Sequence, residues 1–374
     1  MAGISVNPVR SSRELKTFID LPWELYQDDP NWIPPVKSQV AKLLTPGKHP
    51  FWQFSRRELF LALRGSEAVG RIAAIVDEHY NDYQKEKMGI WGFFECRRDP
   101  EAAAALFAAA IKWVRQEGME FIRGPLNPSL NYEAGLLVQG FNSRPTFLMT
   151  YNPPYYLELV KLAGFRKEKD LFTYLSTRDV QPPEWALNLG ERLAQKQEVV
   201  IRKMDPKHFD DEVRLLTRIY IECWGDNWGF VPPTASEVRD MVQSIYPILD
   251  LDLAFFLYVR DEPVGVCIVL PDVSPLLKRF NGKLGLGALI KKHLYWSEIN
   301  GCRGFILGVK EAYRQMGAPL VALHYLLQAA KNKTQYHYVE LGWNLEDNQA
   351  INLLYEEAGL RPHKRYRIFR RDLS

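Results

Sequence analysis

Two stretches near the C-terminus decide the fold: GFILGVKEAYRQMGAPLVALHYLL at residues 304–327 and ELGWNLEDNQAINLLYEEAGL at residues 340–360. In the first, an apolar strand is followed by Arg314-x-x-Gly317 and then by a helical pattern. Such a turn presents backbone N–H groups and the positive end of a helix dipole, which suit a pyrophosphate. By itself the pattern also fits an ordinary strand-turn-helix with Pro319 in the first helical turn.

The second stretch adds a spaced motif about thirty residues further on. Asn348, Ala350, Tyr355 and Gly359 have the spacing N-x-A-x4-Y-x3-G, after a strand that contains an acid and a tryptophan. Together the two stretches resemble the acyl-CoA-binding half of the GNAT acyltransferases. In that family the fourth strand leads into an R/Q-x-x-G-x-G/A loop and the fifth leads into N-x7-Y-x3-G-F.

The order of predicted elements in residues 4–177 recurs in residues 199–372, and the connectors DDPNWIPP and GDNWGFVPP match. Each half is expected to contain a strand, two helices, three strands, a helix, a strand, a helix and a strand. With the resemblance, this predicts an α/β (mixed α+β) fold of two tandem GNAT-like units, each a twisted mixed β-sheet flanked by helices. The predicted boundaries are an N-terminal unit at 1–180 without an acyl-CoA loop, a connector at 181–197, and an acyl-donor-binding unit at 198–374.

Composition limits the function classes. The chain has 374 residues, of which 47% are apolar and 25% are charged, as expected for a globular protein of more than one domain. A net charge of +3 does not favour nucleic-acid binding through bulk charge. Four widely spaced cysteines indicate neither a zinc module nor a disulfide framework. No signal or membrane-spanning pattern is visible, so we predict a cytoplasmic protein with no metal.

The predicted chemistry is attack of an amine on a thioester. The reaction requires a neutral amine, groups that hold the carbonyl, and a proton for the departing thiolate. The resemblance implies that Tyr355 donates this proton, and Glu340 is our first candidate for the base. The alternatives are that the Tyr355 ring only packs under its helix, and that Glu340 is a solvated charge at a strand end.

The resemblance also implies the acyl-donor site, with acyl-CoA or acyl carrier protein as co-substrate and no permanently bound cofactor. One departure from the family pattern is Pro319, which removes a backbone donor from the loop and makes an acyl-protein donor more plausible. Asn344 and Asn348 either cap a helix or bond to the pantetheine amides. The predicted donor-binding residues are Leu307, Val309, Arg314, Gln315, Met316, Gly317, Ala318, Asn344 and Asn348.

The N-terminal half lacks the loop, and Val160 stands where the family tyrosine would be. It carries instead a polar cluster, GPLNPSLNYEAGLL at residues 124–137, followed by Tyr151-Asn152. Buried polar groups need partners, which a substrate or a tight turn provides. We predict that this half contributes the acceptor-binding residues Asn127, Asn131, Glu133 and Tyr151; the alternative is an Asx-turn loop.

Two basic segments have separate interpretations. The insertion at residues 273–297 contains five Lys or Arg residues and several leucines, but no acid before Glu298. We predict peripheral membrane contact, carrier-protein contact or cover for an acyl chain; a solvated lid is the alternative. The run RPHKRYRIFRR at residues 361–371 is expected to form an exposed edge strand guarded by charge.

The predicted function is N-acyltransfer from an acyl thioester, of medium or long chain, to a small or lipid-like amine. The stretches GPLNPSLNYEAGLL and LPDVSPLLKR resemble a tandem branch that includes proteins linked to bacterial sphingolipid N-acylation. The alternatives are a small-molecule N-acetyltransferase and a non-catalytic protein that binds an acyl ligand or partner through a degenerate GNAT unit. The acceptor itself is not encoded in a readable motif.

Overall fold

The computed structural model describes residues 3–196 and 198–373, without the side chains of Leu286, Ala288 and Leu289. Two of the leucines in the basic and apolar insertion at residues 273–297 therefore lie outside the described side chains. Contacts divide the chain differently from the predicted boundaries: 277–292 and 364–374 belong to the first unit, whereas 173–180 and the predicted connector belong to the second. Unit 1 comprises Met1–Phe172, Leu277–Lys292 and Lys364–Ser374, and unit 2 comprises Thr173–Leu276 and His293–His363.

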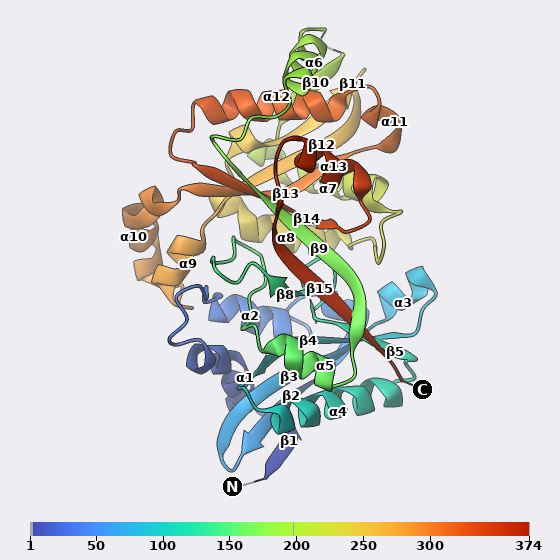
Figure 1. Ribbon diagram of the computed structural model, residues 1–374, viewed down its shortest axis with the longest axis vertical. Coiled ribbons are helices and arrows are strands. Elements are labelled where there is room, and N and C mark those ends of the chain that lie inside the picture. The colour runs from blue at the N-terminus through green and yellow to red at the C-terminus, as the bar shows by residue number, and fades with distance from the viewer. Residues whose placement is uncertain (1–2, 197, 374) are drawn as a thin grey trace. The chain divides into compact units, whose positions relative to one another are not determined.

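Unit 1 is built on a mixed sheet (Figure 1). Its strand order is β1-β2-β3-β4-β5-β15; neighbours are antiparallel except for β4 and β5, which are parallel, and β8 also pairs with β15. The elements up to β9 are β1 (Ile4–Pro8), α1 (Ser12–Leu25), α2 (Lys37–Leu44), the 3₁₀ helix η1 (Pro50–Gln53), β2 (Ser55–Arg64), β3 (Glu67–Asp77), α3 (Glu78–Gln84), β4 (Met88–Cys96), α4 (Pro100–Gln116), β5 (Phe121–Gly124), β6 (Leu126–Asn127), β7 (Glu133–Ala134), β8 (Leu136–Gln139), α5 (Tyr156–Leu162) and β9 (Arg166–Thr177).

Local sequence explains the helices of unit 1. Ser11 and Glu14 form a reciprocal capping box at the start of α1. Asp99 caps α4, and Pro100 occupies its first turn. The apolar face of α4 then packs on the sheet, where the rings of Trp91 and Phe107 lie 5.2 Å apart in an edge-to-face arrangement.

The same sheet continues in unit 2 in the order β14-β13-β12-β11-β10, with β13 and β14 parallel and the other pairs antiparallel. Figure 1 shows α12 lying along one face of these strands. The remaining elements along the chain, of which α9, α10 and β15 lie partly in unit 1, are α6 (Glu184–Gln195), β10 (Val199–Lys203), η2 (Pro206–His208), α7 (Phe209–Trp224), α8 (Ala235–Ile245), η3 (Tyr246–Ile248), η4 (Leu251–Leu253), β11 (Ala254–Val259), β12 (Glu262–Pro271), α9 (Ser274–Phe280), α10 (Leu286–Tyr295), η5 (Trp296–Glu298), β13 (Gly301–Val309), α11 (Glu311–Arg314), α12 (Ala318–Lys331), β14 (Tyr338–Leu345), α13 (Gln349–Glu357) and β15 (Pro362–Asp372).

The predicted repeat is confirmed in the order of elements. Strand β1, helices α1 and α2, strands β2 to β4, helix α4, strand β5, helix α5 and strand β9 correspond in order to β10, α7, α8, β11 to β13, α12, β14, α13 and β15. The mixed α/β fold with helices on the sheets is likewise confirmed.

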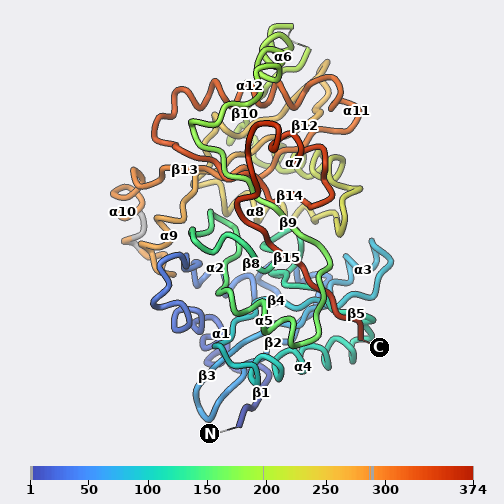
Figure 2. Tube along the Cα trace, viewed as in Figure 1, coloured from blue at the N-terminus to red at the C-terminus, as the bar shows by residue number. Residues whose placement is uncertain are grey.

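The last strand of each repeat leaves the unit in which it begins. Strand β9 starts in unit 1 and ends in unit 2, and β15 starts in unit 2 and ends in unit 1 (Figure 2). Within unit 1 the two strands are neighbours, and the guanidinium of Arg367 donates two hydrogen bonds, of 2.7 and 2.9 Å, to the carboxylate of Asp170. Burial alone would raise the pKa of Asp170, but the bonds from Arg367 and Lys167 lower it below its usual value.

The prediction of an exposed edge strand at residues 361–371 is wrong. Strand β15 pairs with β5 and with β8, and Tyr366, Ile368 and Phe369 are buried. Its basic side chains do not guard an edge, because acidic groups and carbonyls of unit 1 bind them. Lys364, for example, is 1% exposed and donates to the carbonyl of Gly140 at 3.0 Å.

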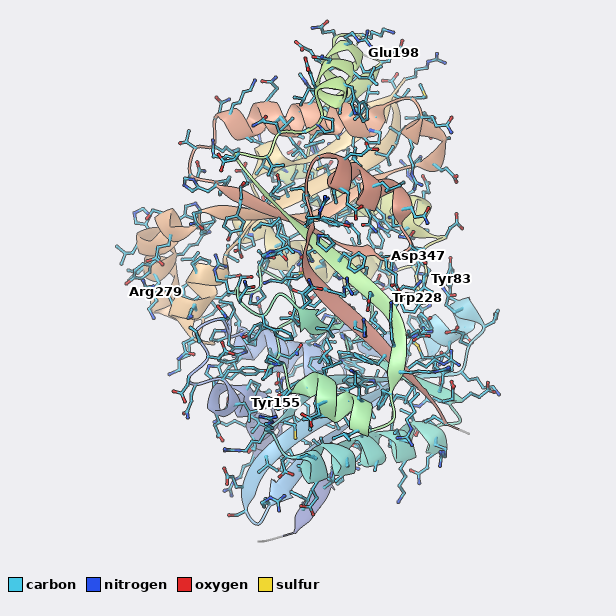
Figure 3. The ribbon with its side chains drawn as sticks, in the orientation of Figure 1. Tyr83, Tyr155, Glu198, Trp228, Arg279 and Asp347 are labelled. Atoms are coloured by element: carbon cyan, nitrogen blue, oxygen red, sulfur yellow. The ribbon has the colours of Figure 1, made fainter. Side chains whose placement is uncertain are left out.

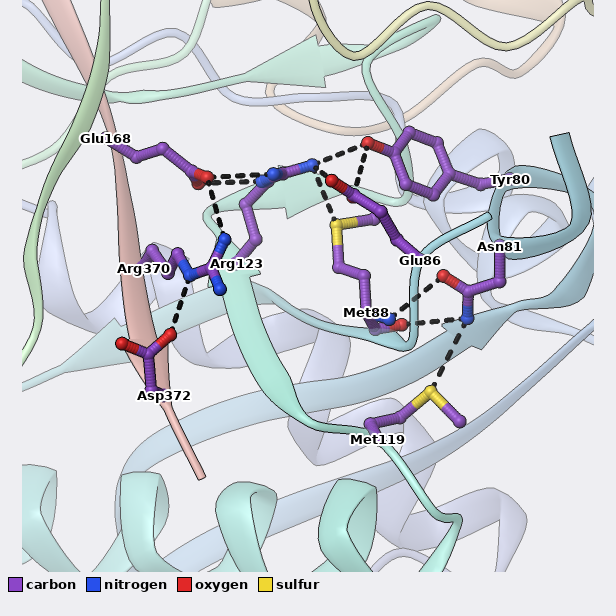
Figure 4. Close-up of polar contacts among 9 residues, drawn as sticks. All are labelled: Tyr80, Asn81, Glu86, Met88, Met119, Arg123, Glu168, Arg370 and Asp372. Carbon is purple, nitrogen blue, oxygen red and sulfur yellow. Dashed lines mark hydrogen bonds and ion pairs between the residues drawn. The ribbon is translucent and has the colours of Figure 1, made fainter. Parts of the chain in front are cut away.

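A buried ion cluster fixes β5 and β15 in unit 1 (Figure 4). Arg123 is 2% exposed and donates to both carboxylate oxygens of Glu168, at 2.7 and 2.8 Å, and to the hydroxyl of Tyr80 at 2.6 Å. Arg370 of β15 lies 3.7 Å from the same carboxylate and also bonds Asp372 at 2.8 Å. Burial acts to lower the pKa of Arg123, but the bond with Glu168 outweighs it and the pKa is raised.

Within the described ranges 3–196 and 198–373, no helix has both the length and the apolar character needed to span a membrane.

Candidate active site

The central feature of unit 2 is the point where two parallel strands part. The ladder recorded between β13 and β14 runs only from Gly301–Gly304 to Tyr338–Leu341, although the strands continue to Val309 and Leu345. Beyond this ladder the facing backbone groups of β13 and β14 do not pair with each other. We call these diverging ends the fork; a ligand with amide groups can hydrogen-bond there.

On the face of β13 that α12 covers, the exposure of side chains changes along the fork. Leu307 is 42% exposed and Val309 is 5% exposed, and both point to the face covered by α12, since Val309 packs with Ala318 and Val321. Cys267 is the ladder partner of Leu307 and belongs to the same core cluster. The α12 face of the fork thus has an exposed leucine beside a buried core.

The loop after β13 is held tightly. Arg314 turns back and donates from Nε to the carbonyl of Val309 at 2.9 Å. Gly317 has φ +79° and forms the N-cap of α12, and a Cβ at this position would lie 2.2 Å from Cδ1 of Leu193. The left-handed backbone therefore favours glycine at this position, and any other side chain would also displace the end of Leu193.

The remaining predicted loop residues divide by exposure. Gln315 and Met316 are exposed, whereas Ala318 is fully buried against the sheet. The expected simple turn contains a short helix, α11, and Pro319 lies in the first turn of α12. The elements that the sequence analysis predicts to bind an anion are therefore the exposed loop and the N-terminus of α12, with one N–H fewer than the family pattern offers.

Tyr355 lies on the α12 face of the sheet. Its ring packs on that of Tyr174 of β9, with centroids 5.0 Å apart. Burial first, and then the nearby Cys267 thiol and Tyr174 phenol, raise the pKa of Tyr355 above the usual tyrosine range. Because Cys267 is the ladder partner of Leu307, the Tyr355 side chain is close to the fork and carries its proton at neutral pH.

Glu340 lies on the opposite face. It is 2% exposed, and its Oε1 accepts a hydrogen bond of 2.7 Å from the hydroxyl of Thr173. Thr173 and Tyr174 are consecutive residues of β9, so their side chains point to opposite faces of the sheet. Glu340 is therefore not a solvated strand-end charge, and its side chain and that of Tyr355 point to opposite faces of the sheet.

Two asparagines in this region have unmet hydrogen-bonding atoms. Nδ2 of Asn344, in the unpaired part of β14, is buried and has no hydrogen-bond partner in the described chain. Asn352 donates to the carbonyl of Leu345 at 3.0 Å, while its buried Oδ1 has no partner among the described residues. Asn348 occupies the N-cap of α13 without a side-chain bond to the helix, so neither predicted asparagine caps that helix through its side chain. One unmet donor and one unmet acceptor suit a ligand amide.

Comparison with known proteins agrees with this geometry. No family model matches the chain. The tandem GNAT protein from the clavulanic acid biosynthesis pathway has a TM-score of 0.55, with 99% of each chain covered and 12% sequence identity, which shows the fold. A protein of Caulobacter vibrioides named bacterial ceramide synthase is 34% identical over 379 residues, covering 100% of this chain and 98% of that protein. The chain belongs to the tandem GNAT acyltransferases.

A second relative of this acyltransferase is Protein YghO of Escherichia coli, 30% identical over 376 residues, which cover 97% of this chain and 94% of that protein. Both relatives align along nearly their whole length. The resemblance seen in the sequence is thus confirmed for the whole chain, including the N-terminal half where the motif signal is faint.

In unit 1 of the acyltransferase the equivalent strands, β4 and β5, also diverge, but residues of the chain itself fill the gap between them. Strands β4 and β5 pair from Met88–Ile90 to Phe121–Arg123 only. Oδ1 of Asn127 then accepts a hydrogen bond of 2.7 Å from the N–H of Phe93, and a Cβ at Gly92 would lie 1.9 Å from the carbonyl oxygen of Leu126. The predicted substrate residue Asn127 therefore closes the first fork.

The other predicted acceptor residues are divided between turn and surface. The N–H of Asn131 donates to Oγ of Ser129 at 3.3 Å, as in the turn-loop alternative. Glu133 is half-buried on β7. The hydroxyl of Tyr151 donates to Oδ2 of Asp29 at 2.8 Å, which adds a carboxylate that the sequence analysis missed.

Glu95 of β4 is a second missed carboxylate. Its Oε2 accepts from the hydroxyls of Tyr26 and Tyr156, at 2.7 and 2.8 Å. Burial first raises the pKa of Glu95, and the charge of Glu133 raises it further, while Arg71 opposes both. A single acid in the otherwise apolar strand sequence GIWGFFEC was the signal that could have found it.

Proposed function

We propose that this acyltransferase moves a medium or long acyl chain from a thioester to the primary amine of a long-chain, lipid-like acceptor. The observation that carries the proposal is the open fork of β13 and β14 beside a protonated Tyr355, in a chain that aligns end to end with a protein named bacterial ceramide synthase. The product is an amide.

The mechanism is one addition and one elimination. The neutral amine nitrogen attacks the thioester carbonyl and forms the C–N bond, and the tetrahedral intermediate then breaks the C–S bond. The amine loses one proton to solvent, and the thiolate takes one from Tyr355, which regains it from solvent. No step of this scheme uses Glu340, whose carboxylate accepts the hydrogen bond of Thr173.

The donor is held along the fork. Its pantetheine amides are bound by the unpaired backbone of β13 and β14 and by Asn344 and Asn352. With coenzyme A, the pyrophosphate lies at residues 314–318, where Gly317 shapes the loop and Arg314 fixes it to β13. With a carrier protein, only the phosphopantetheine arm uses the fork, and the missing N–H of Pro319 has no effect.

The fork of unit 1 is filled by Asn127 and Leu126, so it does not hold an acyl donor. Glu133, with Tyr151 and its partner Asp29, places carboxylates at partly exposed positions of unit 1. Carboxylates attract the ammonium form of the acceptor before it loses its proton.

The first experiment is calorimetric titration with acetyl-, octanoyl- and palmitoyl-coenzyme A below their micelle-forming concentrations, and with S-octanoyl-phosphopantetheine. We expect affinity to rise from acetyl to palmitoyl, because each buried methylene contributes about 0.8 kcal/mol. Gly317→Ala is expected to weaken coenzyme A binding, and Glu133→Gln to leave it unchanged.

Other outcomes have distinct meanings. Binding of acetyl-coenzyme A alone would indicate a small-molecule acetyltransferase. Binding of the phosphopantetheine thioester without the coenzyme A thioesters would indicate a carrier-protein donor. Binding of none of these ligands would contradict the proposed acyltransfer from thioesters held in the fork.

We also propose that residues 273–297, the basic-apolar segment, contact an anionic lipid surface. Ile290 and Leu294 are four residues apart on α10 and are 65% and 62% exposed, and Leu284 before the helix is 50% exposed. Arg279 is exposed on α9 (Figure 3), and the exposed Lys291 and the half-buried Lys292 follow Ile290 in the sequence. Exposed apolar side chains among cations are typical of a surface that binds lipid headgroups.

Lys291→Glu/Lys292→Glu is expected to lower binding to vesicles of phosphatidylglycerol at least about tenfold, since each Lys near such a surface contributes about 1 kcal/mol. Co-sedimentation at low and high salt measures this effect. The matched control Lys161→Glu/Lys196→Glu makes the same charge change at exposed positions elsewhere. Equal loss in both variants, or no binding by the unchanged protein, would contradict lipid contact through this segment.

A further inference from the structure

The face of β13 opposite Leu307 carries an aromatic stack. Tyr220 and Trp224 are one turn apart on α7, and their rings stack with centroids 4.8 Å apart and an interplanar angle of 22°. Phe230 lies 6.0 Å from Tyr220 and continues the aromatic surface. The stack borders the sheet where β13 has already parted from β14.

Gly308 is the residue on which this stack rests. A Cβ at Gly308 would lie 2.2 Å from Cη2 of Trp224, so the indole occupies the space that any other side chain would fill. Gly308 follows the exposed Leu307 in the strand and therefore points to the opposite face. The fork thus has Leu307 on the α12 face and the Trp224 indole on the α7 face.

The donor loop is joined to the stack. Arg314, which bonds the carbonyl of Val309, also donates to the carbonyl of Cys223 at 3.5 Å, and Cys223 immediately precedes Trp224. The Arg314 side chain thus links the loop to the end of α7 that carries the indole.

We infer that Trp224 sets the length of acyl chain that this enzyme accepts. The inference deepens the proposed function and rests on it. A thioester in the fork has its pantetheine on the α12 face, where Tyr355, Ala318 and Leu307 lie. The acyl chain leaves by the other face and runs against the Tyr220–Trp224 stack, so the indole limits how many carbons are buried.

The test measures affinity for acyl-coenzyme A thioesters of four to eighteen carbons, in steps of two, in Trp224→Ala and Trp224→Phe. We expect the preferred length to increase in Trp224→Ala, with the ratio of long- to medium-chain affinities rising about tenfold. Trp224→Phe, which keeps an aromatic ring if the alanine variant folds poorly, is expected to give a smaller shift in the same direction.

Leu307→Ala is the matched comparison, because it shortens a side chain of the same strand on the opposite face. It is expected to weaken all thioesters by a similar factor. A changed length preference in Leu307→Ala but not in Trp224→Ala would overturn the inference and place the chain on the α12 face. Equal weakening of all lengths in Trp224→Ala would also overturn it, whereas failure of the unchanged protein to bind any thioester would refute the proposed donor site itself.

Discussion

Tyr355→Phe is expected to lower kcat for amide formation by about 10²–10⁴-fold, the usual contribution of a positioned general acid. The affinity for the acyl donor should change little, because the phenylalanine ring still packs on Tyr174. The measurement compares kcat from steady-state kinetics with the donor dissociation constant from calorimetry, each in the variant and the unchanged enzyme.

Tyr174→Phe is the matched control for this prediction. The Tyr174 hydroxyl is buried and has no hydrogen-bond partner in the described chain, so its removal leaves no atom unpaired. We expect kcat to remain close to that of the unchanged enzyme. If Tyr174→Phe loses activity and Tyr355→Phe keeps it, Tyr174 is the acid and the assignment of Tyr355 is wrong.

The pH profile gives a further readout of the same assignment. Because the pKa of Tyr355 is raised, its protonated form persists above the pH at which an ordinary tyrosine, with a pKa of about 10, ionises. The rate should therefore rise with pH as the acceptor amine loses its proton, without a fall caused by Tyr355 below about pH 10. An alkaline fall at lower pH that Tyr355→Phe abolishes would contradict a raised pKa.

The second large effect concerns stability. Glu168→Leu is expected to lower the free energy of unfolding of unit 1 by about 3–5 kcal/mol, because it leaves Arg123 buried without its bidentate partner. Tyr80 still accepts from Arg123 at 2.6 Å and Glu86 lies 3.5 Å from the guanidinium, but a neutral hydroxyl and a longer contact with a partly exposed carboxylate do not replace the bidentate pair. Urea unfolding followed by circular dichroism measures the difference.

The double variant Arg123→Met/Glu168→Leu tests the cause. Removing both charges also removes the uncompensated buried charge, so we expect it to be more stable than Glu168→Leu alone. If the double variant is as unstable as the single variant, the loss comes from packing around β5 and β15. A loss below about 1 kcal/mol in Glu168→Leu would show that Arg123 finds another partner.

The closed fork of the first unit explains why we propose a donor site in one of the two repeats only. Both repeats have a parallel pair of strands that part, but Asn127 and Leu126 close the first pair whereas the second pair stays unpaired beyond Gly304 and Leu341. The closure uses a polar side chain that the sequence analysis assigned to substrate binding. A hydrogen bond of Asn127 to the N–H of Phe93 cannot be recognised without knowing that these residues meet.

Much of the fold is determined by sequence alone. Capping residues, glycine and proline positions, and apolar periodicity act within one or two turns, so they predicted most helices and strands and the repeated order of elements. The loop with Arg314 and Gly317 and the spacing from Asn348 to Gly359 also identified the family, because their backbone requirements are local. Gly317 does adopt a positive φ, as such a loop needs.

Only the tertiary structure decided which elements meet. Local patterns could not predict that β15 leaves its own repeat. The carboxylate that binds Arg367 of this strand belongs to Asp170, which lies 197 residues earlier in the sequence. The face occupied by Glu340 depends on Thr173 of a strand more than 160 residues away in sequence. The contact of Trp224 with Gly308 is equally non-local. Strand pairing and side-chain parity are set by long-range neighbours, and a single sequence carries no direct record of them.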